Sequence, residues 1–291
     1  MRAENRTLLG PHDVVLATHP GSGASWIGTL LVHLGVFYVS GHNELLVDRE
    51  SQRTTGEWVE DEELRFPGLA TTGSRDQQQH LPVLEARDHL HASYREPCRV
   101  IKTNRSAVGW TPPTRVVLLV RDGRDAVLSL YHNLRSFGGL DVPLPEFLRG
   151  RDSAWPPPAM SWGFACLSWL GSIASERLHV VKFEACRERP LEEFRALLGF
   201  LGTPRTDAEI EHAMTESSYE RMRRVESAEI ERRGDSIGRG RVMRKGQVGE
   251  WREVYTEEML RTFTGLPRRA LAGFGYPTDT VPHSGSEGCC G

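Results

Sequence analysis

Two stretches of the chain share one pattern of hydrophobic and polar positions. Each begins with an apolar run of strand length, continues through a Gly- or Asp-rich turn and ends with apolar positions at helical spacing. They are Val14–Leu31 and Arg115–Ser129. This order of strand, turn and helix gathers backbone N–H groups and the positive end of a helix dipole around an anion. Two such anion sites indicate a ligand with phosphate or sulfate at both ends.

The rest of the chain alternates short apolar runs with segments of helical spacing. The apolar runs predict buried strands at Val14–Thr18, Arg99–Lys102, Arg115–Val120 and Leu178–Phe183. The helical spacing predicts helices from Trp26 to a stop at Gly35, over Ala126–Arg135, Ser161–Ser175 and Leu191–Leu201, within Glu209–Arg233, and over Trp251–Phe263. Strands that alternate with helices predict an α/β fold: a single domain with a mostly parallel central sheet flanked by helices.

Several segments do not follow these patterns. Residues 40–80 are polar and acidic, which predicts an insertion over the scaffold. Residues 138–160 are rich in Gly and Pro, which predicts a loop or lid. The other predicted irregular segments are a loose N-terminus at 1–12, a Gly-rich basic loop at 238–250 and a flexible tail at 278–291. The α/β domain is therefore assigned to residues 1–277.

The composition narrows the class of protein. With 291 residues the chain can bury a substantial core, and its net charge of −3 does not suggest nucleic acid or an acidic membrane as a partner. The five cysteines show no metal-ligand spacing, so no metal site is expected. An odd cysteine count, the lack of a signal peptide and the lack of a membrane-spanning apolar run favour a cytoplasmic protein.

The turn after the first strand, Pro20–Trp26, reads Pro-Gly-Ser-Gly-Ala-Ser-Trp. It is not a Walker A motif, because it lacks the closing Gly-Lys-Ser/Thr. Its glycines still allow the backbone to approach an oxyanion closely, with Ser22 and Ser25 as hydroxyl donors. A tight strand–helix turn without a ligand is the alternative. After the second strand, Arg121 and Arg124 add guanidinium groups, which bind phosphate through bidentate charge-assisted hydrogen bonds.

These motifs resemble those of the cytosolic-type sulfotransferases, which use 3′-phosphoadenosine-5′-phosphosulfate (PAPS) as sulfuryl donor. The turn at Pro20–Trp26 is similar to the family's Pro-Lys-Ser-Gly-Thr-Thr-Trp loop, which holds the 5′-phosphosulfate. Arg121 and Ser129 match the spacing of the Arg and Ser that bind the 3′-phosphate in the family. Residues Arg244–Trp251 (Arg-Lys-Gly-Gln-Val-Gly-Glu-Trp) resemble an Arg-Lys-Gly-x-x-Gly-Asp-Trp segment that completes the 3′-phosphate site. The resemblance spans about residues 12–265, with all three elements in family order.

The resemblance implies a P-loop-like phosphosulfate-binding loop, PAPS as co-substrate and 3′,5′-adenosine bisphosphate (PAP) as product, without a metal. Weaker matches to the family's adenine contacts are Phe183-Glu184, Ser217-Ser218-Tyr219 and Trp26, which would stack on the base. Core packing is the alternative for Phe183 and Trp26. The implied nucleotide-binding residues are Gly21, Ser22, Gly23, Ala24, Ser25, Trp26, Arg121, Ser129, Phe183, Ser217, Tyr219, Arg244, Lys245 and Gly246.

The chain departs from the family at two catalytic positions. Gly21 stands where the family has a loop lysine at the bridging oxygen, and Asn104 stands where it commonly has a histidine as general base. The loss of a preorganised donor costs about two to three decades in rate, and the loss of a general base about two to four. Three explanations stay open: Lys102 acts with a relocated base such as His19 or His42, the acceptor needs little base catalysis, or the protein binds nucleotide and depends on a partner.

The candidate catalytic residues are therefore Lys102, Ser22 and His19. For His19 and His42 the alternative is an ordinary structural or surface histidine. Candidate walls of the acceptor site are the segments 40–80 and 138–160 together with Trp155, Trp162 and Trp169. Core packing is the alternative for Trp162 and Trp169.

We expect transfer of a sulfuryl group from PAPS to a hydroxyl of a small-molecule acceptor, with a specialised metabolite as the preferred class. Sulfation would also prepare an alcohol as leaving group for a later displacement. The alternative is a catalytically weak, sulfotransferase-like nucleotide-binding subunit that needs a partner protein; a homodimer is a further option. A P-loop kinase is disfavoured, because no Mg²⁺-binding acidic pair is evident. Restoring Gly21→Lys and Asn104→His is expected to separate the first two hypotheses.

Overall fold

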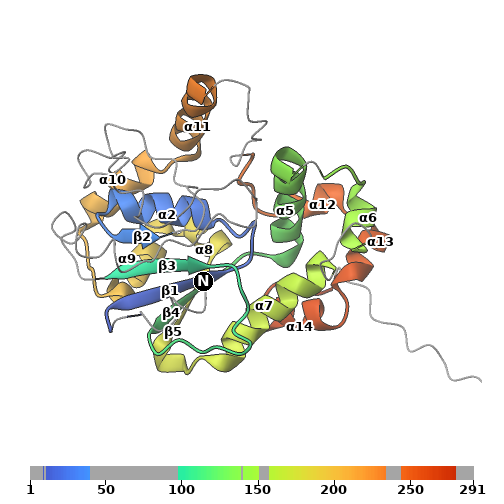
Figure 1. Ribbon diagram of the computed structural model, residues 1–291, viewed down its shortest axis with the longest axis horizontal. Coiled ribbons are helices and arrows are strands. Elements are labelled where there is room, and N and C mark those ends of the chain that lie inside the picture. Colours follow the sequence, from blue (N-terminus) through green and yellow to red (C-terminus); the bar gives the residue numbers. More distant parts are fainter. Residues whose placement is uncertain are drawn as a thin grey trace, which may run out of the picture.

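The computed structural model describes residues 9, 11–39, 98–138, 140–150, 157–233 and 244–279. Its centre is a five-stranded sheet in the order β2-β3-β1-β4-β5 (Figure 1). Every neighbouring pair of these strands is parallel, as the alternation of strands and helices predicted. The strands are β1 (Asp13–Thr18), β2 (Phe37–Val39), β3 (Arg99–Thr103), β4 (Arg115–Val120) and β5 (Leu178–Lys182).

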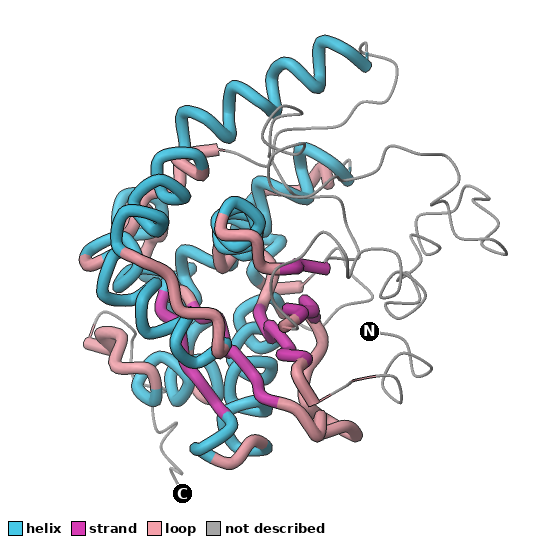
Figure 2. The backbone as a smooth tube through the Cα atoms, turned by 90° about the vertical axis from the view of Figure 1, so that its left-hand side faces the viewer, coloured by secondary structure: helices cyan, strands magenta, loops and turns pink. Residues whose placement is uncertain are grey.

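Helices cover both faces of this sheet. They are α2 (Ala24–His33), α5 (Gly123–Gly138), α6 (Leu144–Leu148), α7 (Pro158–Ser172), α8 (Phe183–Glu188), α9 (Pro190–Leu201), α10 (Asp207–Glu216), α11 (Tyr219–Arg233), α12 (Trp251–Val254), α13 (Glu257–Leu260) and α14 (Leu266–Gly273). In β1, Val15 and Ala17 face the core that contains α5 and α7, whereas Val14 and Leu16 face the core that contains α2, α9 and α10. Figures 1 and 2 show α11 projecting away from the sheet. Among the described residues, no helix is long and apolar enough to cross a membrane.

The parallel arrangement brings the carboxyl ends of the strands to one edge of the sheet. β1 lies between β3 and β4, and its last residues pair as Ala17 with Thr103 and Thr18 with Leu119. After β1 the chain runs first to the β3 side of the sheet and later to the β4 side, so its connections diverge here. Ligands of open α/β sheets bind in the crevice at such a point. The turns after β1 and β4 therefore meet where a ligand site is expected.

The end of α2 confirms the predicted stop at Gly35. Gly35 has a φ of 72° and donates its N–H to Val32 O at 2.9 Å. The N–H of Val36 donates to Leu31 O, also at 2.9 Å. This pair of bonds is a Schellman ending, which needs a residue in the left-handed region and therefore favours glycine.

The strand predicted at Leu178–Phe183 ends one residue early. Val120 and Lys182 form the last pair of β4 and β5, so no residue of β4 is left to pair with Phe183. Phe183 begins α8 instead. Its ring lies so close to the turn after β1 that a Cβ added to Gly23 would stand 2.6 Å from it.

The predicted lid over 138–160 is partly helical, which corrects the expectation of a loop. α6 lies within it, and α7 begins at Pro158. Proline suits this position, because an N–H in the first turn of a helix has no acceptor within the helix. The helix predicted at Ser161–Ser175 is therefore present but begins and ends three residues earlier. Residues 40–80, His42, Trp155 and the tail beyond residue 279 lie outside the described residues.

The C-terminal region differs most from the prediction. The single helix expected over Trp251–Phe263 is divided into α12, α13 and a 3₁₀ turn at Arg261–Phe263. The division arises because Tyr255 is extended and Thr256 caps the start of α13. The sequence pattern also missed β2, which has only three residues, and α14, which is short and has a proline in its first turn.

Candidate functional site

The turn after β1 presents backbone and hydroxyl donors at the start of α2. Gly21 and Gly23 have φ values of 87° and 97°, and Ser22 donates its N–H to His19 O at 3.2 Å. No side chain caps the N-terminus of α2 in the described structure, so its first N–H groups are available to an anion. The Ser22 hydroxyl is buried and has no hydrogen-bond partner among the described residues. A buried hydroxyl without a partner at a helix N-terminus fits a ligand that supplies the missing acceptor.

Gly21 cannot carry a side chain in this arrangement. A Cβ there would overlap the carbonyl oxygen of Ala126 in α5 and would lie 3.2 Å from the backbone nitrogen of Leu130. Its positive φ adds strain for any residue other than glycine. Gly21→Lys is therefore a poor test for separating the two hypotheses, because the turn packs directly on the α5 backbone.

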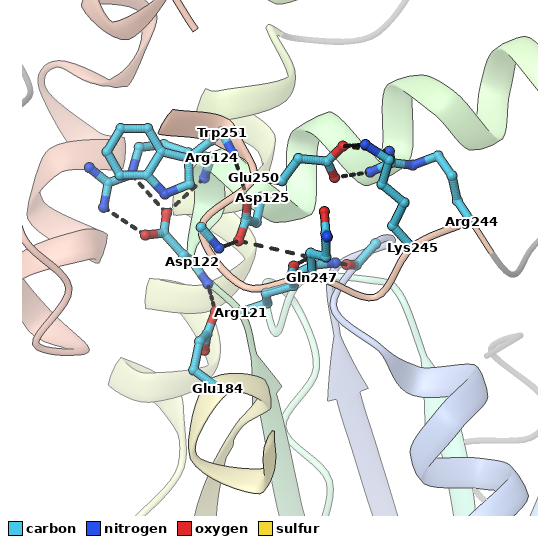
Figure 3. Close-up of polar contacts among 12 residues, drawn as sticks. Arg121, Asp122, Arg124, Asp125, Glu184, Arg244, Lys245, Gln247, Glu250 and Trp251 are labelled. Atoms are coloured by element: carbon cyan, nitrogen blue, oxygen red, sulfur yellow. Dashed lines mark hydrogen bonds and ion pairs between the residues drawn. The ribbon is translucent and has the colours of Figure 1, made fainter. Parts of the chain in front are cut away.

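Arg121 joins this turn to the C-terminal loop 244–250 (Figure 3). Its Nη1 donates to Gly21 O at 3.0 Å and its Nη2 to Gln247 O at 2.6 Å. The guanidinium lies 4.6 Å from the centre of the Phe183 ring, and its buried Nε has no partner in the described part of the chain. Burial lowers the pKa of Arg121, and the carboxylate of Asp125 opposes this shift. Arg121 thus holds two loops together and retains one buried donor for a ligand.

Asp125 attaches the loop 244–250 to the first turn of α5. Its carboxylate accepts the N–H of Gly249 at 2.6 Å and the N–H of Trp251 at 3.0 Å, and it lies 3.8 Å from Arg121 (Figure 3). Burial raises the pKa of the Asp125 carboxyl, whereas Arg121 and the two N–H groups lower it. Asp125 therefore positions the backbone of this loop against α5.

The basic residues of the same loop share one carboxylate. Glu250, which is buried, accepts hydrogen bonds from both terminal nitrogens of Arg244 and lies 3.2 Å from Lys245 Nζ (Figure 3). The hydrogen bond from Arg244 is the main reason that the pKa of Glu250 falls to about 2. Two cations held on one anion leave a net positive charge at the surface of the loop.

Ser129 and His132 follow Asp125, which holds this basic loop, along α5. Ser129 lies one helical turn beyond Asp125 and is half-buried, and His132 follows after almost another turn. Burial lowers the pKa of His132, and the charge of Arg244 lowers it further. The charge of Arg244 thus acts on α5 at His132, and the grouping of Arg121, Ser129 and the basic loop stays a prediction.

Arg124 does not take part in the candidate site, contrary to the expectation that it adds an anion ligand. Its side chain is 0% exposed, and its Nε and Nη2 donate to Asp122 at 2.8 and 2.6 Å. The guanidinium lies 3.8 Å from the centre of the Trp251 ring. The backbone carbonyl of Arg124 accepts a hydrogen bond from the Tyr255 hydroxyl. Arg124 is a buried structural cation that fixes the start of α12.

The predicted adenine contacts differ in exposure. Phe183 is buried among Gly23, Arg121 and Trp26, so packing accounts for its position. Trp26 is half-buried, and its ring meets Phe183 nearly at a right angle with 5.6 Å between centroids. Trp26 therefore keeps part of its surface available to a base.

Ser217 and Tyr219 serve the junction between α10 and α11. The buried Ser217 hydroxyl donates to Ala213 O at 2.7 Å at the end of α10. The Tyr219 hydroxyl donates to Arg244 O and accepts from Arg223. Tyr219 thus links α11 to the basic loop, while the Ser217 hydroxyl is directed at its own helix.

The candidate catalytic side chains lie at the carboxyl edge of the sheet. Lys102 is half-buried near the end of β3, and Asn104 is exposed just after it. His19 is buried, with Nδ1 2.8 Å from Pro20 O, and burial lowers the pKa of its imidazole to about 4. Because this pKa is below its usual value, His19 is neutral above about pH 4 and is a weak base.

Trp162 and Trp169 lie in the core and do not line an open acceptor site. They are 0% and 1% exposed. Trp162 packs on Gly123, where an added Cβ would stand 2.5 Å from the indole, and Trp169 Nε1 donates to Arg105 O at 2.8 Å. Of the two alternatives for these residues, core packing is correct.

Comparison with known proteins identifies the family. The model of the sulfotransferase domain family matches residues 11–275, which is most of the chain. The chain belongs to the sulfotransferase family. Flavonol 3-sulfotransferase of Flaveria bidentis is 24% identical over 295 residues, covering 94% of this chain and 86% of that protein. Sulfotransferase 1B1 of Mus musculus is 22% identical over 277 residues, covering 90% and 84%.

Two solved structures share the fold. Mouse sulfotransferase SULT7A1 complexed with PAP has a TM-score of 0.57 and 19% identity, covering 90% of this chain and 87% of that chain. Retinol dehydratase in complex with androsterone and PAP has a TM-score of 0.56 and 19% identity, covering 93% and 82%. At these identities the comparison establishes the α/β fold.

Among the acidic residues of the candidate site, Asp125 was missed by sequence reasoning, whereas Glu184 and Glu250 were named only as parts of their motifs. Asp125 and Glu250 hold its loops, and Glu184 accepts the N–H of Asp122 at 2.9 Å and the hydroxyl of Tyr276 at 2.8 Å. Burial is the main cause that raises the pKa of Glu184. The spacing of Asp125 four residues after Arg121 was the signal available in the sequence, since such residues are neighbours on a helix.

Proposed function

We propose that the chain transfers a sulfuryl group from PAPS to a hydroxyl of a small-molecule acceptor and releases PAP. The observation that carries the proposal is the position of Arg121, which hydrogen-bonds the glycine turn and the basic loop at one edge of the sheet. Membership of the sulfotransferase family and the PAP in the similar structures support it. A specialised metabolite is the proposed acceptor class, and later displacement of the sulfate is a proposed use of the product.

In this proposal each part of the site binds one group of PAPS. The turn after β1 and the N-terminus of α2 hold the 5′-phosphosulfate, with the Ser22 hydroxyl as an additional donor. Arg121, Ser129 and the basic residues Arg244 and Lys245, with the N–H of Gly246, hold the 3′-phosphate. Guanidinium groups suit this dianion because they donate paired, charge-assisted hydrogen bonds. Trp26 stacks on the adenine.

Lys102 is the proposed cation at the transferred group. Sulfuryl transfer depends mainly on the positioning of the reactants and on positive charge beside the oxygen that becomes negative during the reaction. Since Gly21 has no room for a side chain, the lysine at the end of β3 is the candidate for this charge in the described structure. The proposal assigns the remaining charge compensation to the arginines and the α2 dipole, in a cytoplasmic protein without a metal.

Calorimetric titration with PAP, and with ADP as control, tests the nucleotide site. We expect micromolar binding of PAP and much weaker binding of ADP, because ADP lacks the 3′-phosphate that Arg121 and the basic loop would bind. Equal affinity for both nucleotides, or no binding of PAP, would contradict the proposed function.

A second candidate is a nucleotide-binding subunit with little activity of its own, which works as a homodimer or with a partner protein. It is favoured by Gly21, which excludes the family's lysine, and by Asn104, which replaces the family's histidine. Asn104→His separates the two candidates, because Asn104 is exposed and accepts a histidine without repacking. We expect PAPS-dependent turnover in the unchanged protein and less than about a tenfold gain in the variant, measured against Asn104→Gln. A silent protein that gains about a hundredfold or more on Asn104→His would support the second candidate.

A further inference from the structure

The indole of Trp26 has one aromatic neighbour on each of two helices and a cation on its face. The rings of Phe183 and Phe194 each lie 5.6 Å from Trp26 between centroids, with interplanar angles of 77°. Neither ring stacks parallel to the indole. The guanidinium of Arg187 lies over the indole at 5.6 Å from its centre. The position that a stacked base would take beside Trp26 is therefore next to Arg187.

Arg187 reaches this position from α8. It follows Phe183 by four residues, so both side chains lie on the same face of the helix. Arg187 is exposed, and among the described residues no carboxylate forms an ion pair with it. Its contact with Trp26 therefore holds the guanidinium only weakly, since exposed cation–π contacts contribute little.

We propose that Arg187 is a base-stacking residue that forms a purine clamp with Trp26, a specificity role within the nucleotide site proposed above. Two stacked layers at van der Waals distance need about 7 Å, so the guanidinium must move outward from 5.6 Å when the base enters. An exposed side chain that forms no ion pair with the described residues can make this movement at little cost. A planar guanidinium then covers the outer face of the base, while Trp26 covers the inner face.

A clamp of this kind depends on the base, whereas simple charge attraction does not. Stacking increases with the area of the aromatic base, so a purine gains more from the clamp than a pyrimidine. Charge attraction acts on the phosphates, which are the same in every nucleoside 3′,5′-bisphosphate. The two roles of Arg187 are therefore separated by nucleotides that differ only in the base.

The experiment compares Arg187→Ala and Arg187→Lys by titration with adenosine 3′,5′-bisphosphate and uridine 3′,5′-bisphosphate. We expect Arg187→Ala to weaken binding of the adenosine compound about threefold to tenfold and binding of the uridine compound less than about twofold. Arg187→Lys keeps the positive charge but loses the planar guanidinium group. It should therefore retain only part of the adenosine affinity that Arg187→Ala loses. The thermal midpoint of the protein should not change, because Arg187 is exposed.

Arg189→Ala is the matched control. Arg189 is exposed and only two residues away, but it pairs with Glu192 at 3.5 Å and Glu193 at 3.1 Å. Its loss should leave both affinities unchanged. Unchanged affinity in Arg187→Ala, or an equal loss for both bases, would overturn the clamp while the proposed function stands. If the unchanged protein does not bind adenosine 3′,5′-bisphosphate, the proposed function fails and the clamp with it.

Discussion

Arg121→Ala is expected to weaken the binding of PAP by at least about 2 kcal/mol, or about 30-fold. The side chain is placed for two tasks at once. It is the proposed ligand of the 3′-phosphate, and it also holds the carbonyls of Gly21 and Gln247 together. Its removal takes one of the charged partners from the phosphate and frees the glycine turn from the basic loop. Titration of the folded variant with PAP measures the effect.

Two further variants separate binding from stability in this experiment. Arg177→Ala is the matched control, because Arg177 also donates to two carbonyls, of Pro112 at 2.9 Å and Thr114 at 3.4 Å. These groups lie at the amino ends of β4 and β5, away from the candidate site. Arg177→Ala should lower stability in urea without changing PAP affinity. Arg121→Lys keeps a charge but loses the guanidinium fork, so it should recover only part of the binding. Unchanged affinity in Arg121→Ala would remove Arg121 from the site.

Gly21→Lys is expected to destabilise the protein by more than about 3 kcal/mol and to give no gain in turnover. A residue with a Cβ at a left-handed φ costs about 1–2 kcal/mol. At Gly21 the Cβ would also overlap the Ala126 carbonyl oxygen, so the turn or α5 must move. Because the overlap begins at the Cβ, Gly21→Ala should be almost as harmful as Gly21→Lys. Unfolding in urea measures both variants.

Gly35→Ala isolates the steric part of this prediction. Gly35 has a φ of 72°, similar to Gly21, but no described residue lies within 4 Å of a Cβ added there. Gly35→Ala should therefore lower the free energy of unfolding only by the backbone strain of a left-handed φ, about 1–2 kcal/mol. If Gly21→Lys is as stable as Gly35→Ala and gains turnover, the turn accommodates a lysine and the packing argument is wrong.

Several elements were predictable because the signal is local. The run Arg115–Val120 and the stop at Gly35 depend on neighbouring residues, and both are present in the structure. The boundaries that failed depend on distant partners. β5 ends at Lys182 because β4 ends at Val120, and Tyr255 interrupts the C-terminal helix where its hydroxyl reaches the Arg124 carbonyl. No window of sequence contains these contacts.

The candidate site divides in the same way. The order of residues alone established the glycine turn, the arginine after β4 and the basic loop, because each is a short motif whose spacing carries its chemistry. The tertiary structure decided what each side chain is free to do. It buried Arg124 against Trp251, and it closed the space at Gly21 with the backbone of α5. These outcomes depend on segments far apart in the chain, which only the packing of α5 against the turn and the C-terminal loop brings into contact.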